Sequence, residues 1–199
     1  ANSRFGFSAK TTLSLAQALY EKHKVLPYPR TDSRALPEDY VDAVKQTMKM
    51  IAGEDLPGPL RELAPRAKKA LAEGYVKPVK RVFDNAKVSD HFAIVPTLQA
   101  PKSLSEIEAK LYDMVVKRFL AVFFPPAEFM VTTRISTVKA GVTGQQQEHK
   151  FQTNGKVMVK PGWLAVYGKE VQEDDANLVA VAPGEAVHTE NVAVNALKT

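Results

Sequence analysis

The sequence contains no cysteine, which excludes disulfide bonds, thiolate zinc sites and cysteine nucleophiles. This absence makes a reducing compartment, the cytoplasm, the expected location of the protein. Long apolar runs are also missing. The longest candidate, residues 114–124, is interrupted by Lys117 and Arg118, whereas a membrane span needs about 18 to 20 apolar residues. We therefore expect no membrane anchor.

The first residues include neither an initiating methionine nor the apolar region of a signal peptide. We therefore interpret the sequence as an internal piece of a longer protein. Its 199 residues are 45% hydrophobic and 25% charged, which is typical of a folded globular protein. This composition excludes disordered and collagen-like classes.

The charge is unevenly distributed along the chain, which has a net charge of +5. Basic residues outnumber acidic ones in residues 1–34 and 61–87, and acidic residues outnumber basic ones in residues 165–199. Basic clusters favour a polyanionic partner, because each neutralised phosphate releases counterions and adds affinity. An ordinary solvated surface is the alternative at this point.

Helical spacing of apolar residues predicts four amphipathic helices, over residues 8–22, 37–53, 66–73 and 105–124. Ser8 is the expected N-cap of the first helix. Ser105 and Glu108 have the spacing of a capping box at the start of the last one. The expected apolar faces include Leu13 and Ile107.

The remaining apolar runs are typical of strands. Two of them are residues 76–83 and 93–95, and the last third of the chain is β-rich, with runs at residues 131–138, 157–159 and 163–167. Asn154 and Gly155 form a hairpin signal. Two weaker runs flank the turn signal Pro183 and Gly184 within residues 178–194. The predicted fold class is α+β, with a mainly helical first part followed by a long helix and a β-rich segment.

Residues 28–33 combine a nucleophile with a phosphate-binding cation. In an extended backbone Tyr28, Arg30 and Asp32 lie on one side. A tyrosine phenol has an ordinary pKa of about 10, so attack on phosphorus needs a base or a cation that favours the phenolate. Arg30 would supply that cation and bind phosphate, with Asp32 orienting it or handling a proton. Taken alone, Thr31, Asp32 and Ser33 are standard loop and cap residues, and the residues by themselves favour a structural loop over a catalytic one.

A second candidate is His91, which precedes an apolar run within residues 90–97. Histidine can donate to a phosphate or transfer a proton near neutral pH, although a structural role is also compatible with this position. The other histidines (His23, His149 and His188) lack metal-ligand spacing, so no metal site is predicted. The sequence also lacks phosphate-loop, dinucleotide-binding and nucleophile-elbow motifs.

Three of these segments, in this order, resemble motifs of the type IA DNA topoisomerases, in their topoisomerase III form. The matching segments are residues 1–13 (ANSRFGFSAKTTL), residues 28–37 (YPRTDSRALP) and residues 90–97 (DHFAIVPT). Residues 111–124 and 151–167 are similar to later family segments, less specifically. One position departs from the family pattern, because Pro27 stands where a small hydroxyl residue usually precedes the tyrosine. Proline removes a backbone donor there.

The resemblance implies a mechanism. Tyr28 would be the nucleophile that forms a 5′-phosphotyrosyl link with single-stranded DNA, Arg30 would contact the scissile phosphate, and His91 would assist cleavage or DNA positioning. Another strand would pass through the protein gate before resealing without ATP. Further DNA contacts would come from Arg4, Lys10, Asp32, Ser33 and Arg34.

In this family the acidic residues and Mg²⁺ belong to a Toprim domain, whose Asp-x-Asp-x-Glu cluster is absent from this sequence. The resemblance thus implies no cofactor in this piece, Mg²⁺ in the full-length enzyme, and an inactive isolated fragment. It also implies a tyrosine domain over residues 1–100, a helical return over 101–128 and part of a hinged arch over 129–199. Its partners would be single-stranded DNA and the Toprim domain.

Two other classes remain open on the residues alone. A non-catalytic module for single-stranded nucleic acid would keep the basic stretches without depending on Tyr28. A tyrosine recombinase or relaxase would need several active-site arginines or a histidine metal cluster, and the sequence shows no such arrangement. Covalent trapping of DNA distinguishes the nucleophilic class from the binding module.

Overall fold

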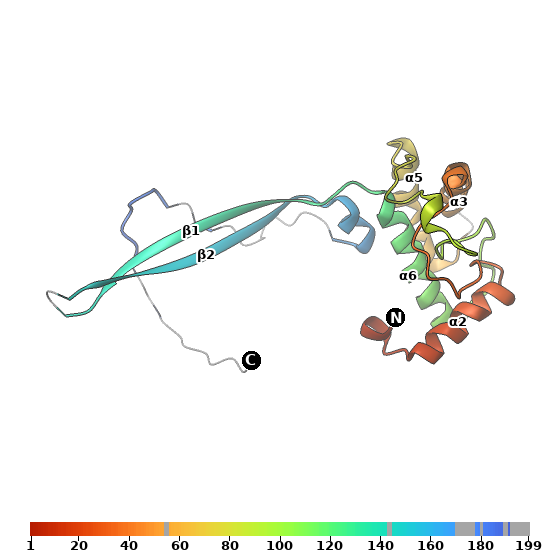
Figure 1. The fold of residues 1–199 in the computed structure, drawn as a ribbon, viewed down its shortest axis with the longest axis horizontal. Helices are drawn as coiled ribbons and strands as arrows, with labels where there is room; N and C mark the ends of the chain where they lie inside the picture. The colour runs from red at the N-terminus through yellow and green to blue at the C-terminus, as the bar shows by residue number, and fades with distance from the viewer. Residues whose placement is uncertain (54–55, 143–144, 170–177, 180, 189–190, 192–199) are drawn as a thin grey trace. The chain divides into compact units, whose positions relative to one another are not determined.

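The computed structural model describes residues 1–53, 56–142, 145–169, 178–179, 181–188 and 191. It is α+β, as the sequence predicts in outline, and divides into two compact units. Unit 1 comprises Ala1–Glu128 and Met158–Val171, and unit 2 comprises Phe129–Val157 and Gln172–Thr199. Unit 1 contains every described helix, and unit 2 contains most of a two-stranded hairpin (Figure 1).

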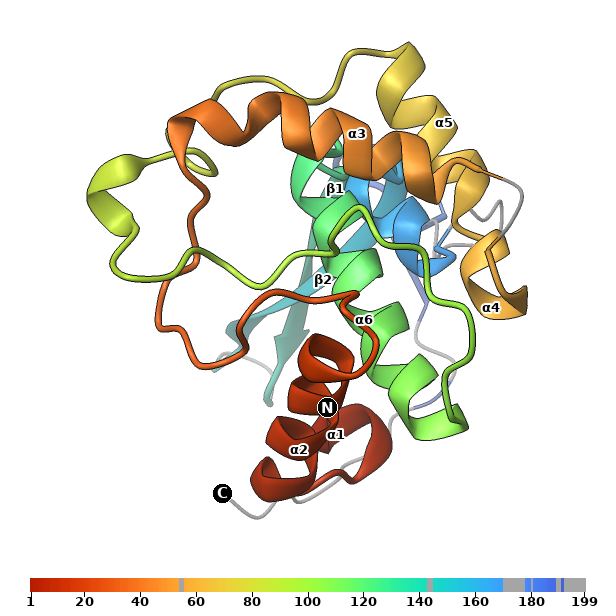
Figure 2. The ribbon, with the colours of Figure 1, turned by 90° about the vertical axis from the view of Figure 1, so that its right-hand side faces the viewer.

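The helices of unit 1 gather around the longest of them, α6 (Glu106–Phe123) (Figure 2). It packs against α2 (Ala9–Glu21), α4 (Gly58–Arg61), α5 (Ala64–Ala72) and the 3₁₀ helix η3 (Gly162–Tyr167). The other helical segments of the described chain are α1 (Asn2–Phe5), η1 (Glu38–Tyr40), α3 (Val41–Ile51) and η2 (Asn85–Lys87). All four predicted helices are therefore confirmed, and the short helix α4, before α5, was not predicted.

The start of each long helix follows its predicted cap. The Ser8 hydroxyl accepts a hydrogen bond from the Thr11 backbone amide, and Ser105 forms the full capping box with Glu108. The predicted apolar faces are partly wrong, because Leu13 and Ile107 are 39% and 44% exposed. Leu19 and Leu111 are buried as predicted, and the core of these helices also includes neighbouring positions, namely Leu15, Tyr112, Val116 and Leu120.

Helix α2 ends in an unusual way. Lys24 has a φ of 59°, the left-handed region that side chains other than glycine rarely adopt. Two backbone bonds close the helix around it, from the His23 amide to the Ala18 carbonyl and from the Val25 amide to the Leu19 carbonyl. This is the pattern of a left-handed C-terminal cap. It turns the chain sharply into the segment that carries Tyr28.

The short strands predicted for residues 76–83 and 93–95 are wrong. These residues form loops. The first loop is joined to Leu36 by an isolated bridge at Phe83. The second is joined to Ala35, whose carbonyl accepts a hydrogen bond from the Ala93 amide. Each loop makes too few consecutive backbone bonds for a ladder. Pro78 contributes to this, since it has no amide hydrogen to donate.

The hairpin differs from the prediction in the position of its turn and in the length of its strands. β1 (Glu128–Ala140) and β2 (Gln147–Lys160) are longer than expected, and their connection lies between residues 140 and 147. Asn154 and Gly155 therefore lie inside β2 and do not form its turn. Within unit 2, Asn154 accepts a hydrogen bond from the Thr133 hydroxyl of the neighbouring strand at 3.0 Å, which occupies its side chain in the ladder.

Two further strand predictions have different outcomes. Residues 163–167 are not a strand, because they belong to η3, which begins after Pro161 and ends at Gly168 with a φ of 78°. The turn at Pro183 and Gly184 is present, with the Glu185 amide bonded to the Ala182 carbonyl. The described residues of 178–194 form no strand, and the other residues of those runs lie outside the described part. Among the helices that the structure describes, none is long and apolar enough to cross a membrane.

Glu108 connects α6 to the end of α2. One carboxylate oxygen accepts hydrogen bonds from the Ser105 amide and hydroxyl at 2.8 and 2.7 Å, and the other lies 3.2 Å from the His23 ring nitrogen Nε2. The carboxylate is buried, with its side chain 12% exposed. The bond from the Ser105 backbone amide, followed by those from the Ser105 hydroxyl and His23, lowers the pKa of Glu108 below its ordinary value of 4.5.

Glu108→Gln should lower the free energy of unfolding by about 1 to 2 kcal/mol at pH 7, because the amide has one accepting oxygen in place of two and lacks the charge that strengthens these bonds. A depressed folded-state pKa stabilises the fold above the unfolded pKa, and this contribution is lost as pH falls through the folded value. The difference between wild type and variant should therefore shrink below about pH 4.5. Urea unfolding at several pH values measures it.

The control is Glu106→Gln in the same helical turn, where the side chain is 81% exposed and should matter little. A Glu108→Gln difference that does not change with pH would contradict the assignment of this bond network.

Candidate active site

Backbone hydrogen bonds hold the segment of residues 25–36, hereafter the tyrosine loop, at both ends. At its start, the Val25 carbonyl accepts from the Thr97 amide at 3.0 Å. At its end, the Ala35 carbonyl accepts from the Ala93 amide at 2.9 Å. Both donors belong to residues 82–97, hereafter the histidine segment. The two candidate motifs, about 60 residues apart in sequence, are thus fixed side by side.

Three more bonds complete this attachment. Leu36 donates its amide to the Val82 carbonyl at 2.8 Å and accepts from the Asp84 amide at 2.9 Å. The Thr97 hydroxyl donates to the carbonyl of Lys24, the residue with positive φ, at 2.7 Å. Val25, Leu26, Ala35 and Leu36 are buried, so the ends of the tyrosine loop are in the core. The residues between them reach the surface, except Pro29, which is buried.

Tyr28 is half-buried between two other rings. Its ring centroid lies 4.6 Å from that of His91 and 5.7 Å from that of Tyr20 on α2, the latter edge to face. The Lys24 ammonium lies over the Tyr20 ring, 5.6 Å from its centroid. Such ring pairs restrict the side-chain rotamers of Tyr28. The predicted nucleophile and the predicted histidine are therefore in direct contact.

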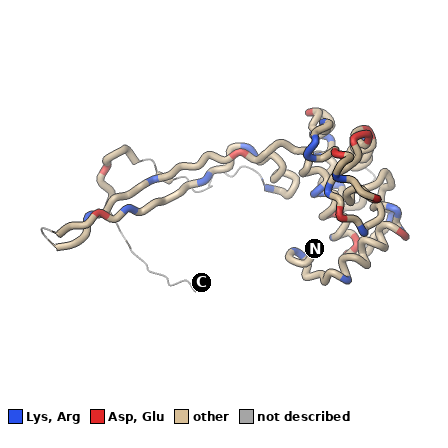
Figure 3. The backbone as a smooth tube through the Cα atoms, in the orientation of Figure 1, with Lys and Arg blue, Asp and Glu red and all other residues tan. Residues whose placement is uncertain are grey.

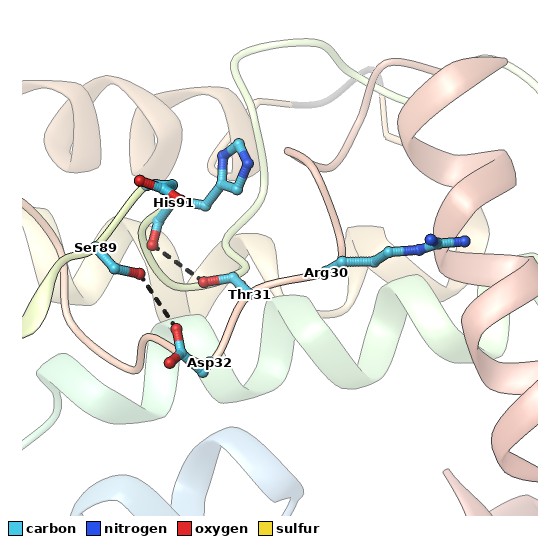
Figure 4. Close-up of a pocket in the computed structure, with 6 residues that line it drawn as sticks. Arg30, Thr31, Asp32, Ser89 and His91 are labelled. Carbon is cyan, nitrogen blue, oxygen red and sulfur yellow. Dashed lines mark hydrogen bonds between the residues drawn. The ribbon is translucent and has the colours of Figure 1, made fainter.

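A polar cavity of about 550 Å³ adjoins this pair and is lined by both motifs: Arg30, Thr31, Asp32, Ser89, Asp90 and His91. The Thr31 hydroxyl donates to the His91 carbonyl at 3.0 Å, and the Ser89 hydroxyl donates to Asp32 at 3.2 Å (Figure 4). These side-chain bonds supplement the backbone bonds at the ends of the loop. They leave the imidazole of His91 exposed.

Arg30 and Asp32 do not face each other, although period-two alternation placed them on one side with Tyr28. Figure 4 shows the Arg30 side chain directed away from Asp32 and His91. Among the described residues, no ion pair joins Arg30 to Asp32. The alternation fails because the tyrosine loop is not a strand and bends at Pro29. The exposed Arg30 guanidinium is therefore available to a ligand, and Asp32 does not orient it.

The other predicted DNA contacts are dispersed. Arg4 on α1 and Lys10 on α2 are exposed, and Arg4 lies over the Phe5 ring at 5.7 Å. Arg34 is exposed on the tyrosine loop. Ser33 has a structural partner, since its hydroxyl donates to the Lys87 carbonyl at 2.8 Å. None of these four lines the cavity, and Figure 3 shows basic positions scattered among acidic ones over unit 1.

Four residues of the site were not singled out from the sequence. Thr31, Ser89 and Asp90 line the cavity, and Tyr20 packs on Tyr28. Ser89 and Asp90 come just before His91, so their position in the motif was an available signal. The sequence held no signal for Tyr20 beyond its place on the apolar face of α2. Among the described residues, no group of three or more histidine, aspartate or glutamate side chains is arranged to hold a metal ion.

Comparison with known proteins identifies the family. A model of the DNA topoisomerase family matches residues 1–199. The chain is 43% identical over 177 residues to DNA topoisomerase 3 of Bacillus licheniformis and 40% identical over 185 residues to that of Shouchella clausii. These alignments cover 88% and 92% of this chain but only 22% and 23% of the relatives, so the chain spans less than a quarter of their length.

The match over all 199 residues and the similarity to bacterial topoisomerases 3 agree with the two motifs that meet at Tyr28 and His91. The chain belongs to the DNA topoisomerase family, as a type IA, topoisomerase III-like segment.

Proposed function

We propose that this chain carries the nucleophilic half of a type IA DNA topoisomerase active site, which cleaves and reseals single-stranded DNA through Tyr28. The observation that supports this most is the position of Tyr28. It is held against His91 beside a polar cavity lined by both motifs. The lining offers the Arg30 guanidinium, two hydroxyls and the His91 imidazole to a phosphodiester, beside the carboxylates of Asp32 and Asp90.

In the proposed step the Tyr28 hydroxyl oxygen attacks the scissile phosphorus and loses its proton. The P–O3′ bond breaks, and the leaving 3′ oxygen takes up a proton. The phosphodiester is thereby replaced by a 5′-phosphotyrosyl ester, which conserves the bond energy. Attack by the 3′ hydroxyl on this ester reverses the step, so resealing requires no ATP. Passage of another strand takes place between the two steps.

Arg30 would bind the non-bridging phosphate oxygens and stabilise the charge that grows in the transition state. Its exposure and lack of an ion-pair partner among the described residues support this role. His91 would donate to the phosphate or move a proton, since its imidazole is exposed while its backbone is fixed by Thr31. Arg4, Lys10 and Arg34 would add phosphate contacts along the strand. Asp32 and Ser33 would shape the loop through Ser89 and the Lys87 carbonyl.

Mg²⁺ would be held by a Toprim acidic cluster supplied from outside these 199 residues, and it would neutralise phosphate charge and position the leaving oxygen. The described residues offer no substitute cluster. We therefore expect the 199-residue chain alone to bind single-stranded DNA weakly and not to relax supercoiled DNA. In the parent enzyme the hairpin of unit 2 would belong to the hinged arch around the gate.

Tyr28→Phe in the parent enzyme should abolish the covalent protein–DNA adduct, because the phenylalanine ring keeps the contacts with Tyr20 and His91 but lacks the attacking oxygen. Denaturing gels with end-labelled single-stranded DNA detect the adduct. Tyr20→Phe is the matched control and should retain it. An undiminished adduct in Tyr28→Phe would refute the assignment, because another nucleophile would then form the link. Absence of an adduct from the wild-type enzyme would instead favour the alternative, a non-catalytic module for single-stranded nucleic acid.

Arg30→Lys should slow cleavage by about 30- to 1,000-fold, equivalent to roughly 2 to 4 kcal/mol, because an ammonium cannot reproduce the planar bidentate contact with phosphate. Single-turnover cleavage rates measure this, beside DNA affinity, which should change far less. Arg34→Lys, on the same loop but outside the cavity, should cleave at the wild-type rate. Cleavage by Arg30→Lys at the wild-type rate would reduce Arg30 to a simple electrostatic contact.

A further inference from the structure

A second cavity lies at the C-terminal end of α6, away from the tyrosine. It has a volume of about 420 Å³, and its lining combines two arginines with an indole ring: Arg81, Arg118, Ala121, Val122, Phe124, Pro126 and Trp163. The cavity beside Tyr28 is lined by residues 30–32 and 89–91, and the two cavities share no lining residue. The two cavities are therefore distinct.

Backbone geometry fixes the aromatic wall of this cavity. The Trp163 amide donates to the Pro125 carbonyl at 2.9 Å, which ties η3 to the end of α6. The indole packs edge to face on Tyr167, with the ring centroids 5.8 Å apart, and remains 39% exposed. A large aromatic ring that is fixed in place and partly open to solvent provides a stacking surface for another planar group.

The two arginines have different local roles. Arg81 donates from its guanidinium to the Val122 carbonyl at 3.0 Å, which offsets the negative end of the α6 dipole. Its other nitrogen donors remain available. Arg118 is exposed one turn earlier on α6 and makes no ion pair within the described residues. Its neighbour Lys117 is paired with Asp113, and Glu128, two residues after Pro126, is paired with Lys160. No described carboxylate thus competes for Arg118.

We propose that this cavity, hereafter the α6-end cavity, is a second contact for single-stranded DNA, in which a base stacks on Trp163 and an adjoining phosphate is bound by Arg118 and Arg81. Stacking platforms combined with cations are typical of sequence-independent single-strand binding. Through Arg81 it gives part of the basic stretch of residues 61–87 a defined role. It rests on the proposed function only in taking DNA as the ligand. An acidic peptide segment is the competing occupant.

Trp163 is the sole tryptophan of the chain, so its fluorescence reports directly on the α6-end cavity. An oligothymidylate should quench this emission to saturation, and an abasic oligonucleotide of equal length should not, because it carries the same phosphates without bases. Arg118→Gln should weaken the apparent affinity for oligothymidylate, as measured by this quenching, at least about 5-fold at fixed salt. The matched control, Lys68→Gln, removes one exposed positive charge on α5 and should shift it less than 2-fold.

Fluorescence anisotropy of labelled oligothymidylate, on the same chain, separates the possible outcomes. DNA binding with unchanged Trp163 emission, or with equal losses in Arg118→Gln and Lys68→Gln, overturns the α6-end site and leaves the Tyr28 mechanism untouched. Absence of DNA binding overturns both the site and the expectation that this chain binds DNA. Quenching by an octaglutamate peptide but not by oligothymidylate assigns the cavity to an acidic protein segment. Circular dichroism melting confirms that each variant is folded.

Discussion

The attachment of the tyrosine loop to the histidine segment is the constraint on which the site depends. Val25 and Ala35 accept backbone bonds from Thr97 and Ala93, and the buried ends of the loop prevent water from competing for them. Between these fixed ends the chain is free of secondary structure, so Tyr28 can lie at the surface without losing its place. A nucleophile that must meet a DNA backbone needs this combination, because small misplacements of reacting groups are costly.

Helix α6 links this constraint to the rest of unit 1. At one end Glu108 closes the capping box and contacts His23, the residue just before the left-handed turn at Lys24. At the other end Arg81 covers a terminal carbonyl, and η3 packs on the last turns. The proposed cleavage site and the proposed α6-end cavity are therefore parts of one packed unit that shares α6. A single strand that contacts both would be held at a fixed span.

The sequence predicted the features that local rules control. Ser8 and Ser105 began their helices because capping is decided within four residues. The motifs also identified Tyr28 and His91, which the structure brings into contact. The sequence failed where distant partners decide the outcome. Asn154 and Gly155 lie within β2, whose pairing with β1 overrides a local turn signal, and Arg30 points away from Asp32 because the loop is anchored elsewhere. Residues 163–167 were predicted as a strand because no local sequence signal indicates that Trp163 packs beside α6.

The central claim is that the 199-residue chain by itself holds Tyr28 against His91. Nuclear Overhauser spectroscopy on the isotopically labelled chain tests it directly, since ring protons within about 5 Å of one another exchange magnetisation. Rings whose centroids lie 4.6 Å apart should give cross-peaks between the Tyr28 ring and the His91 imidazole, together with protected amides at Ala93 and Thr97. Absence of these cross-peaks, with rapid amide exchange at both positions, would show that the loop is not anchored and would contradict the account.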